Sequence, residues 1–340
     1  MKKLRMAIMG AGGIASCMAR TIAEMENVER YAIGSRTLEK AEAFASEYGF
    51  ARAYGSYEEL VRDENVDLVY IATPHSEHFE NAKLCIAHGR PVLCEKAFTA
   101  NAAQACELLE MAEKAGVFIT EAIWVRYLPM LETIRKELAD GIIGEPTMLT
   151  ANLGYVISQV PRLRRPELAG GALLDVGVYP LNFALMIFGG EVAKVSSVCT
   201  YTDTGVDEQN SATLIYEDGK VAVLNSSMLS LSDRKGIIYG TKGFMIVENI
   251  NNFESLTVYD QDRREIKHID CPPQISGYEY EVEACIRALE EGRLECPQMP
   301  HAETIRVMKM MDAMRAEWGI RYPFECRLSH PDKHIRVGGV

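Results

Sequence analysis

Apolar residues in the first third of the chain fall alternately into short runs and into helical spacings. The first run covers residues 6–9 and breaks into glycines, after which apolar residues recur at Ile14, Met18, Ile22 and Met25. Further runs of strand length cover residues 28–35, 66–72, 91–94 and 117–120, with helical patterns between them, the clearest over 102–115. Strands that alternate with helices predict a doubly wound parallel sheet, and so an α/β fold.

The pattern changes after residue 124. From residue 195 to about 269, predicted strands follow one another with only turn signals between them, at 217–219, 241–243 and 260–262. Strands without intervening helices predict an α+β domain with a large, mostly antiparallel open sheet. We therefore expect domains over residues 1–124 and 125–325. The second is closed by helices 280–291 and 302–317, the latter packing back toward the first domain, and 326–340 form a mobile tail.

The composition limits the classes of partner. The chain has 340 residues and a formal net charge of -12, which argues against nucleic acid or a membrane as the main partner. Nine cysteines without a C-x-x-C pair indicate reduced thiols and a cytoplasmic location. Residues 1–9 resemble the start of a signal peptide, but glycines interrupt the apolar core, so we expect no cleavage. His75 and His78 have metal-like spacing without a third ligand, and no metal is expected.

The glycines after the first predicted strand fit the G-x-G-x-x-A pattern of a dinucleotide-binding turn. Gly10 permits a sharp turn, Gly12 lets the backbone approach a pyrophosphate, and Ala15 allows close packing of the helix on the strand. Gly13 and Ile14 open the helix, whose free N–H groups attract phosphates. The alternative is a glycine-rich turn without a ligand. The place of these glycines between a strand and a helix favours a bound nucleotide. The motif therefore predicts a Rossmann domain over residues 1–124.

The end of the second predicted strand bears on the choice of cofactor. Where many such folds carry an acid for the ribose 2′-hydroxyl, this chain has Ser35 and Arg36. Thr37 then caps a helix with Lys40 in its first turn, and a second capping pair, Ser56 with Glu59, starts the next helix. A hydroxyl and a guanidinium bind a 2′-phosphate, so NADP(H) is preferred over NAD(H). The alternative is that Arg36 is only a solvated surface charge.

Other candidate cofactor contacts follow the remaining strands, because ligands bind beyond the carboxyl ends of parallel strands. They are Thr73, Pro74, His75 and His78 after one strand and Glu95 and Lys96 after the next. Just past the last strand of the sheet, Arg126 is predicted to reach the cofactor phosphates and Trp124 to wall the nicotinamide, with interdomain packing as the alternative for Trp124. Arg162, Arg164 and Arg165 are interpreted as a solvated basic loop, with attraction of an anionic or polyol substrate as the alternative.

Four stretches together, residues 10–15, 73–78, 95–96 and 170–179, resemble the glucose–fructose oxidoreductase/inositol dehydrogenase (Gfo/Idh/MocA) family over nearly the whole chain. Residues 121–127 and 170–179 are most similar to its branch of dimeric dihydrodiol dehydrogenases and NADP-dependent xylose dehydrogenases. The resemblance implies hydride transfer between a nicotinamide cofactor and the carbinol or carbonyl carbon of a sugar, polyol or cyclic diol. It also implies a homodimer, or a dimer of dimers, formed through the second-domain sheet.

Three residues match the catalytic positions of that family. Lys96 matches the lysine of its E-K-P motif, although Ala97 replaces the proline, Asp175 matches its aspartate, and Tyr179 stands where most members have histidine. A base is needed for the hydroxyl proton, and we expect Tyr179 to serve as general acid/base with a pKa lowered by Lys96. Asp175, one helical turn earlier, orients the substrate or pairs with Lys96. The alternative is a buried Asp–Lys pair beside a core aromatic.

Two other functions fit the same fold. One is an NAD-dependent inositol-type dehydrogenase, against which Ser35 and Arg36 argue. The other is a non-catalytic regulator that senses the cofactor, against which the intact set of Lys96, Asp175 and Tyr179 argues, because a sensor needs no proton relay.

Overall fold

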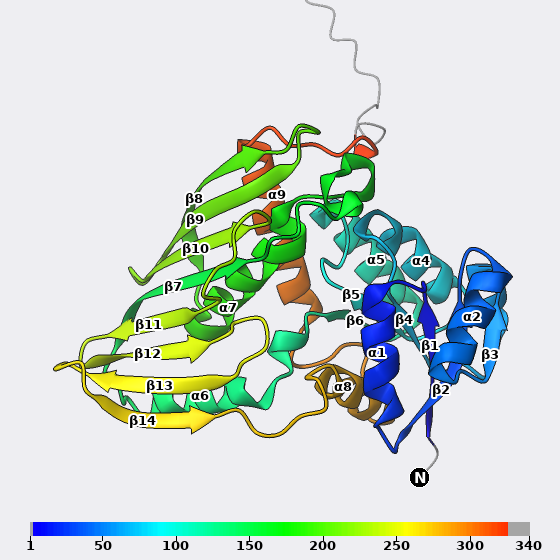
Figure 1. Ribbon diagram of the computed structural model, residues 1–340, viewed down its shortest axis with the longest axis horizontal. Helices are drawn as coiled ribbons and strands as arrows, with labels where there is room; N and C mark the ends of the chain where they lie inside the picture. Colours follow the sequence, from blue (N-terminus) through cyan, green and yellow to red (C-terminus); the bar gives the residue numbers. More distant parts are fainter. Residues whose placement is uncertain (1–2, 326–340) are drawn as a thin grey trace, which may run out of the picture.

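The computed structural model describes residues 3–325; the predicted mobile tail, 326–340, lies outside them. The chain builds two sheets side by side, with helices α7 (Val178–Phe188) and α9 (His301–Glu317) between them (Figure 1). The predicted combination of a doubly wound parallel sheet and a second, mostly antiparallel sheet is confirmed.

The first sheet has six parallel strands in the order β3-β2-β1-β4-β5-β6. The strands at its centre are buried on both faces, which explains their continuous apolar runs. The predicted last strand, 117–120, starts two residues later, at Ile119. The strands are β1 (Leu4–Met9), β2 (Val28–Gly34), β3 (Arg52–Tyr54), β4 (Leu68–Ile71), β5 (Val92–Glu95) and β6 (Ile119–Ala122).

Five helices connect these strands: α1 (Gly13–Ala23), α2 (Leu38–Tyr48), α3 (Tyr57–Arg62), α4 (His75–Ala87) and α5 (Ala102–Ala115). Both predicted capping residues act as expected. The Thr37 hydroxyl accepts a hydrogen bond from the backbone N–H of Lys40, and the Ser56 hydroxyl accepts one from Glu59. Each cap satisfies a backbone donor that has no partner within its helix, and so fixes where the helix begins.

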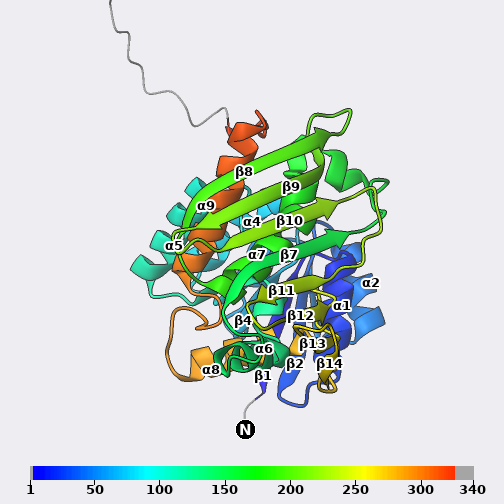
Figure 2. The ribbon, with the colours of Figure 1, turned by 90° about the vertical axis from the view of Figure 1, so that its left-hand side faces the viewer.

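The second sheet has eight strands in the order β14-β13-β12-β11-β7-β10-β9-β8. Only β7 and β10 are parallel neighbours; the other pairs are antiparallel. Helices α7 and α9 pack on one face, whereas none of the helices within residues 3–325 covers the other face (Figure 2). The strands are β7 (Pro146–Gly154), β8 (Val192–Tyr201), β9 (Asp207–Tyr216), β10 (Val221–Ser227), β11 (Gly236–Gly240), β12 (Gly243–Glu248), β13 (Ser255–Asp260) and β14 (Glu265–Asp270).

Helices α6 (Pro129–Ala139), α8 (Glu279–Glu290) and α9 accompany this sheet. Helix α9 also contacts the first half of the chain, because Asp312 accepts a hydrogen bond from the backbone N–H of Ala102, 2.8 Å away, at the start of α5. Arg315 adds a bond to the carbonyl of Ala100. The two halves are therefore joined by polar contacts as well as by apolar packing.

Helix α7 is apolar on nearly all sides, with Asn182 and the hydroxyl of Tyr179 as its polar groups. Residues Pro166–Phe188, which include it, would cross a membrane by length and composition alone, but 89% of the most apolar window is buried inside the molecule. Between the second sheet and the first half of the chain, a helix that is apolar on nearly all sides is what the core requires.

Candidate active site

A cavity of about 400 Å³ lies beyond the carboxyl ends of the first-sheet strands. Its first wall consists of three loops, residues 12–14, 72–75 and 95–96, which follow β1, β4 and β5. The opposite wall comes from the second half of the chain, through Arg162, Asp175, Tyr179 and Tyr278. The cavity thus joins the predicted glycine turn to the three predicted catalytic residues.

The glycine turn has the geometry that a dinucleotide requires. Gly10 has a φ of +103°, and a Cβ there would stand 2.9 Å from the carbonyl oxygen of Ala72. Gly12 and Gly13 differ, because a Cβ at either would meet nothing within 4 Å. Gly12 precedes α1 without a side-chain cap, so the first N–H groups of that helix stay available. Fully buried Ala15 lets α1 pack on the sheet. These residues fit a pyrophosphate in front of Gly12 and Gly13.

The residues predicted to select the cofactor lie beside this turn. The backbone N–H of Gly10 bonds to the carbonyl of Gly34, the last residue of β2, which brings the end of β2 next to the glycines. Ser35 is buried, whereas Arg36 and Lys40 are exposed and do not line the cavity. A ligand in the cavity can therefore contact Arg36 and Lys40 only through a group that extends out of the cavity along β2.

The loop after β4 brings Thr73, Pro74 and His75 to the cavity wall. The Nδ1 atom of His75 lies 3.1 Å from the carbonyl oxygen of Ala169, and burial lowers the pKa of His75 to about 3, so the imidazole is neutral. His78 is placed differently from its prediction as a cofactor contact. It is fully buried behind the wall.

The ring nitrogens of His78 lie 2.9 Å from the carbonyl oxygen of Ala97 and 2.8 Å from that of Thr73. His78 thus ties two loops of the site together instead of lining it. Across residues 3–325, no three histidine, cysteine or acidic side chains are grouped so that they could hold a metal ion.

The Lys96 ammonium contacts Asp175 twice. Its Nζ atom lies 2.9 Å from the backbone oxygen of Asp175 and 3.4 Å from Oδ1, and the Lys96–Ala97 peptide bond is cis. The same Oδ1 accepts a bond of 2.9 Å from Arg162. Burial alone would raise the pKa of Asp175, but the charges of Lys96 and Arg162 outweigh it and hold that pKa well below its usual range. Asp175 is therefore a carboxylate at neutral pH.

Tyr179 lies on the same wall as Asp175, as predicted, although residues Leu173–Gly177 form a π-helical turn rather than a regular α-helix. The predicted lowering of the Tyr179 pKa is wrong in direction. Burial raises the pKa of Tyr179 well above 10, and the ammonium lies 5.3 Å from the centre of the ring, bonded to Asp175. The phenol is therefore protonated at neutral pH.

Glu95 also lines the cavity and accepts a hydrogen bond from the hydroxyl of Tyr70. Burial raises the pKa of Glu95 to about 7, in opposition to the charge of Lys96. This carboxyl group therefore changes its charge close to neutral pH, within the cavity.

Neither residue of the predicted pair beyond β6 lines the cavity. Arg126 was expected to reach the cofactor phosphates, but it is buried and donates to Asn182 at 2.6 Å and to Glu303 at 2.9 Å, on α7 and α9. Its guanidinium is thus held by the second half of the chain. Trp124 lies behind the wall, stacked on Tyr278 with ring centres 4.1 Å apart.

Three cavity residues were not predicted as site residues, namely Ala72, Arg162 and Tyr278. Arg162 was assigned to a solvated loop, yet it turns inward to Asp175, while Arg164 and Arg165 pair with the surface acids Asp203 and Glu167. Three neighbouring arginines give no signal of which one turns inward. Tyr278 follows Gly277, whose φ of +102° marks a constrained turn, but a Gly-Tyr pair alone does not identify a site.

Comparison with known proteins identifies two family matches. Residues 4–122 match the oxidoreductase family with an NAD-binding Rossmann fold (GFO_IDH_MocA), and residues 131–246 match the GFO/IDH/MocA C-terminal domain. Over 324 residues the chain is 36% identical to trans-1,2-dihydrobenzene-1,2-diol dehydrogenase of Xenopus tropicalis, covering 93% of this chain and 98% of that protein.

Solved structures share the fold. KijD10, a 3-ketoreductase from Actinomadura kijaniata in complex with NADP and TDP-benzene, aligns with a TM-score of 0.85 at 23% identity, over 93% of this chain and 98% of that one. Levoglucosan dehydrogenase, in complex with NADH and levoglucosan, aligns with a TM-score of 0.83 at 19% identity, over 94% and 97%.

The two glycines of the turn predict opposite results on substitution by alanine. Gly12→Ala places a methyl group in open space at a φ of -102°, so the thermal midpoint stays unchanged while affinity for NADPH falls about tenfold or more, at least 1.4 kcal/mol. Gly10→Ala strains the backbone and lowers stability by roughly 1–3 kcal/mol. Thermal melts and fluorescence titration with NADPH measure both. Unchanged NADPH binding by the Gly12 variant would show that the turn holds no nucleotide.

Proposed function

The chain belongs to the Gfo/Idh/MocA family of NAD(P)-binding oxidoreductases, and from this premise we propose how its own residues act on a CH–OH group. Tyr179 is the general acid/base, Lys96 binds the reacting oxygen, and Asp175 orients Lys96. The observation that supports this most is that Tyr179 faces the same cavity as the glycine turn, beside the Lys96–Asp175 pair. The alternative of a non-catalytic regulator is not retained, because the relatives are named as dehydrogenases.

The proton has a defined route. When bound, the nicotinamide takes or gives the hydride. The Tyr179 oxygen takes the hydroxyl proton as the substrate is oxidised, and returns it to the carbonyl oxygen in reduction. Because burial raises the pKa of Tyr179, the donor is ready for reduction, whereas oxidation needs the phenolate and accelerates as the pH rises. Lys96 has three N–H donors and directs two contacts at Asp175, so one donor stays free for the substrate oxygen.

Asp175 and Arg162 supply a second contact to the substrate. The contacts of the Asp175 carboxylate with Lys96, Arg162 and His75 all go to Oδ1, so Oδ2 can accept a hydroxyl. Arg162 has 43% of its side chain exposed and uses one of its N–H groups on Asp175. We therefore propose a sugar, polyol or cyclic diol with a second hydroxyl next to the reacting one. Suitable probes are trans-1,2-dihydrobenzene-1,2-diol, the compound in the relatives' name, and aldoses.

NADP(H) is the proposed cofactor, with NAD(H) as the alternative. The support is the pair Ser35 and Arg36 at the end of β2, where no carboxylate stands to repel a 2′-phosphate. The neighbours of known structure include one complex with NADP and one with NADH, so the fold alone does not decide the preference.

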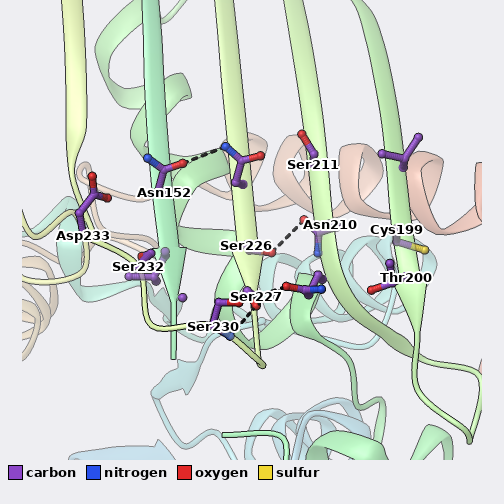
Figure 3. A pocket seen from close by; sticks show the side chains of 15 residues that line it. Asn152, Cys199, Thr200, Asn210, Ser211, Ser226, Ser227, Ser230, Ser232 and Asp233 are labelled. Carbon is purple, nitrogen blue, oxygen red and sulfur yellow. Dashed lines mark hydrogen bonds between the residues drawn. The ribbon is translucent and has the colours of Figure 1, made fainter. Parts of the chain in front are cut away.

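A homodimer, or a dimer of dimers, through the open face of the second sheet is the proposed assembly. A groove of about 540 Å³ crosses this face, and its polar side chains already bond to one another, as Asn225 does to Asn152 and Ser227 to Gln209 (Figure 3). Satisfied polar groups cost little to cover. Val198, 68% exposed on β8, offers apolar area beside them.

Tyr179→Phe tests the acid/base role. The variant keeps the ring and loses the hydroxyl, so turnover of the diol or aldose probe falls by about 10²- to 10⁴-fold while NADPH binding stays nearly intact. Tyr216→Phe is the matched control, because its buried hydroxyl has no hydrogen-bond partner among residues 3–325 and lies away from the cavity. Normal turnover by the Tyr179 variant would remove the assignment.

Arg36→Ala tests the cofactor preference. Loss of one charged contact to the 2′-phosphate weakens NADPH binding by about tenfold and leaves NADH binding unchanged. Parallel fluorescence titrations measure both, with the exposed Arg135→Ala on α6 as control. Tighter binding of NADH than NADPH by the unmodified protein would reverse the proposal.

Val198→Asp tests the assembly. A charge among the residues that line the groove of the proposed interface converts the dimer to a monomer, which light scattering after gel filtration detects. Leu38→Asp, 48% exposed on α2 and remote from the sheet, keeps the mass of the unmodified protein. An unmodified protein that is already monomeric at micromolar concentration contradicts the proposal.

A further inference from the structure

We propose that Trp124 is a positioning residue for the reaction, whose indole N–H holds the Tyr179 hydroxyl in the orientation that proton transfer needs. The inference rests on the proposed acid/base role of Tyr179. It replaces the nicotinamide wall expected from the sequence with a different task, because Trp124 lies behind the cavity wall rather than on it.

The direction of the Trp124–Tyr179 hydrogen bond is fixed by chemistry. The indole nitrogen can only donate, so the bond of 3.2 Å runs from Nε1 of Trp124 to the oxygen of Tyr179. Both side chains are buried, 6% and 7% exposed, so water does not compete for that oxygen from behind. With one lone pair occupied by the indole, the hydroxyl proton of Tyr179 is turned away from Trp124. The remaining open side is the cavity.

The indole is held in place from several sides. Its ring stacks on Tyr278 with an interplanar angle of 11°, and a Cβ at Gly277 would stand 2.9 Å from its Cζ3 atom. The Gly277–Tyr278 turn is itself fixed, because the Glu279 carboxylate accepts bonds from the backbone N–H groups of Ile275, Ser276 and Gly277. Arg126, two residues beyond Trp124, is anchored on α7 and α9. These contacts together fix the position of the indole ring.

Charged and titratable groups around Tyr179 come from several elements. Lys96 at the end of β5 lies over the ring, Glu95 precedes it, Asp175 lies on the π-helical turn, and Tyr278 lies before α8. Burial is the largest effect on the pKa of Tyr179, and Tyr278, Glu95 and Asp175 also raise it, whereas the bond from Trp124 lowers it. The indole therefore opposes the groups that disfavour the phenolate.

The first test is the pH dependence of Trp124→Phe. Without the donor, the pH at which kcat/KM for oxidation of the probe alcohol reaches half its maximum rises by about one unit, and the affinity for NADPH is unchanged. Trp318→Phe is the matched control, since this second tryptophan is buried with its Nε1 unpaired among the described atoms. A Trp124 variant that folds, binds NADPH and keeps the pH profile of the unmodified enzyme overturns the inference.

The second test needs neither substrate nor cofactor. The chain has two tryptophans, so ¹⁵N-tryptophan labelling gives two indole signals, which the Trp318→Phe variant assigns. Tyr179→Phe shifts the Trp124 indole signal, because its acceptor is lost, and leaves the Trp318 signal in place. An unmoved Trp124 signal overturns the inference even if Trp124→Phe fails to fold.

The two tests separate the inference from the proposed function. Full turnover by Tyr179→Phe with a shifted Trp124 signal removes the acid/base role and leaves the contact without a catalytic purpose. Loss of turnover by Tyr179→Phe, with an unchanged pH profile in Trp124→Phe, keeps the proposed function and removes the task of Trp124.

Discussion

The contact between Lys96 and Asp175 is the interaction on which the rest of the site depends. It joins the end of β5 to the turn before α7, residues 79 positions apart in the chain, across the boundary between the two sheets. A buried carboxylate is tolerated only with charge partners and hydrogen bonds, and here Lys96, Arg162 and the neutral His75 surround it. The same carboxylate keeps the ammonium over the Tyr179 ring, so the geometry of the proposed proton transfer follows from this one pair.

The architecture followed from local patterns in the sequence. Buried strands give continuous apolar runs, the glycine turn stands between strand and helix, and Thr37 and Ser56 cap the helices as predicted. The start of β6 was misplaced by two residues because Val117 and Phe118 are as apolar as a strand, yet pairing with β5 begins at Ile119. The periodicity of apolar residues indicates which of them are buried. The residues at which a strand begins and ends depend instead on its pairing with the neighbouring strand.

The site was less accessible to such reasoning, because side-chain direction depends on segments remote in sequence. Arg126 is oriented by Asn182 and Glu303. Arg162 turns inward to Asp175, whereas Arg164 pairs with Asp203 at the surface. The pKa of Tyr179 was predicted in the wrong direction because a neighbouring cation can be guessed from a motif, but the degree of burial cannot. Residue types were thus predictable where a motif carries them, as were the two helix caps and the Lys96–Asp175 pair, whereas the contacts of Arg126 and Arg162 were not.

The central place of β7 in the second sheet has a consequence for the order in which the chain assembles. Its parallel partner β10 lies far along the chain, with Asn152 and Asn225 separated by 73 residues, and the α5–α9 contact spans 210. Closing such long loops costs entropy before any pairing compensates it, so contacts of this kind form slowly. During synthesis, the glycine turn and its strands emerge and can fold well before β10 and α9 exist. The wall that carries Asp175 and Tyr179 then docks onto a nucleotide-binding half that is already formed.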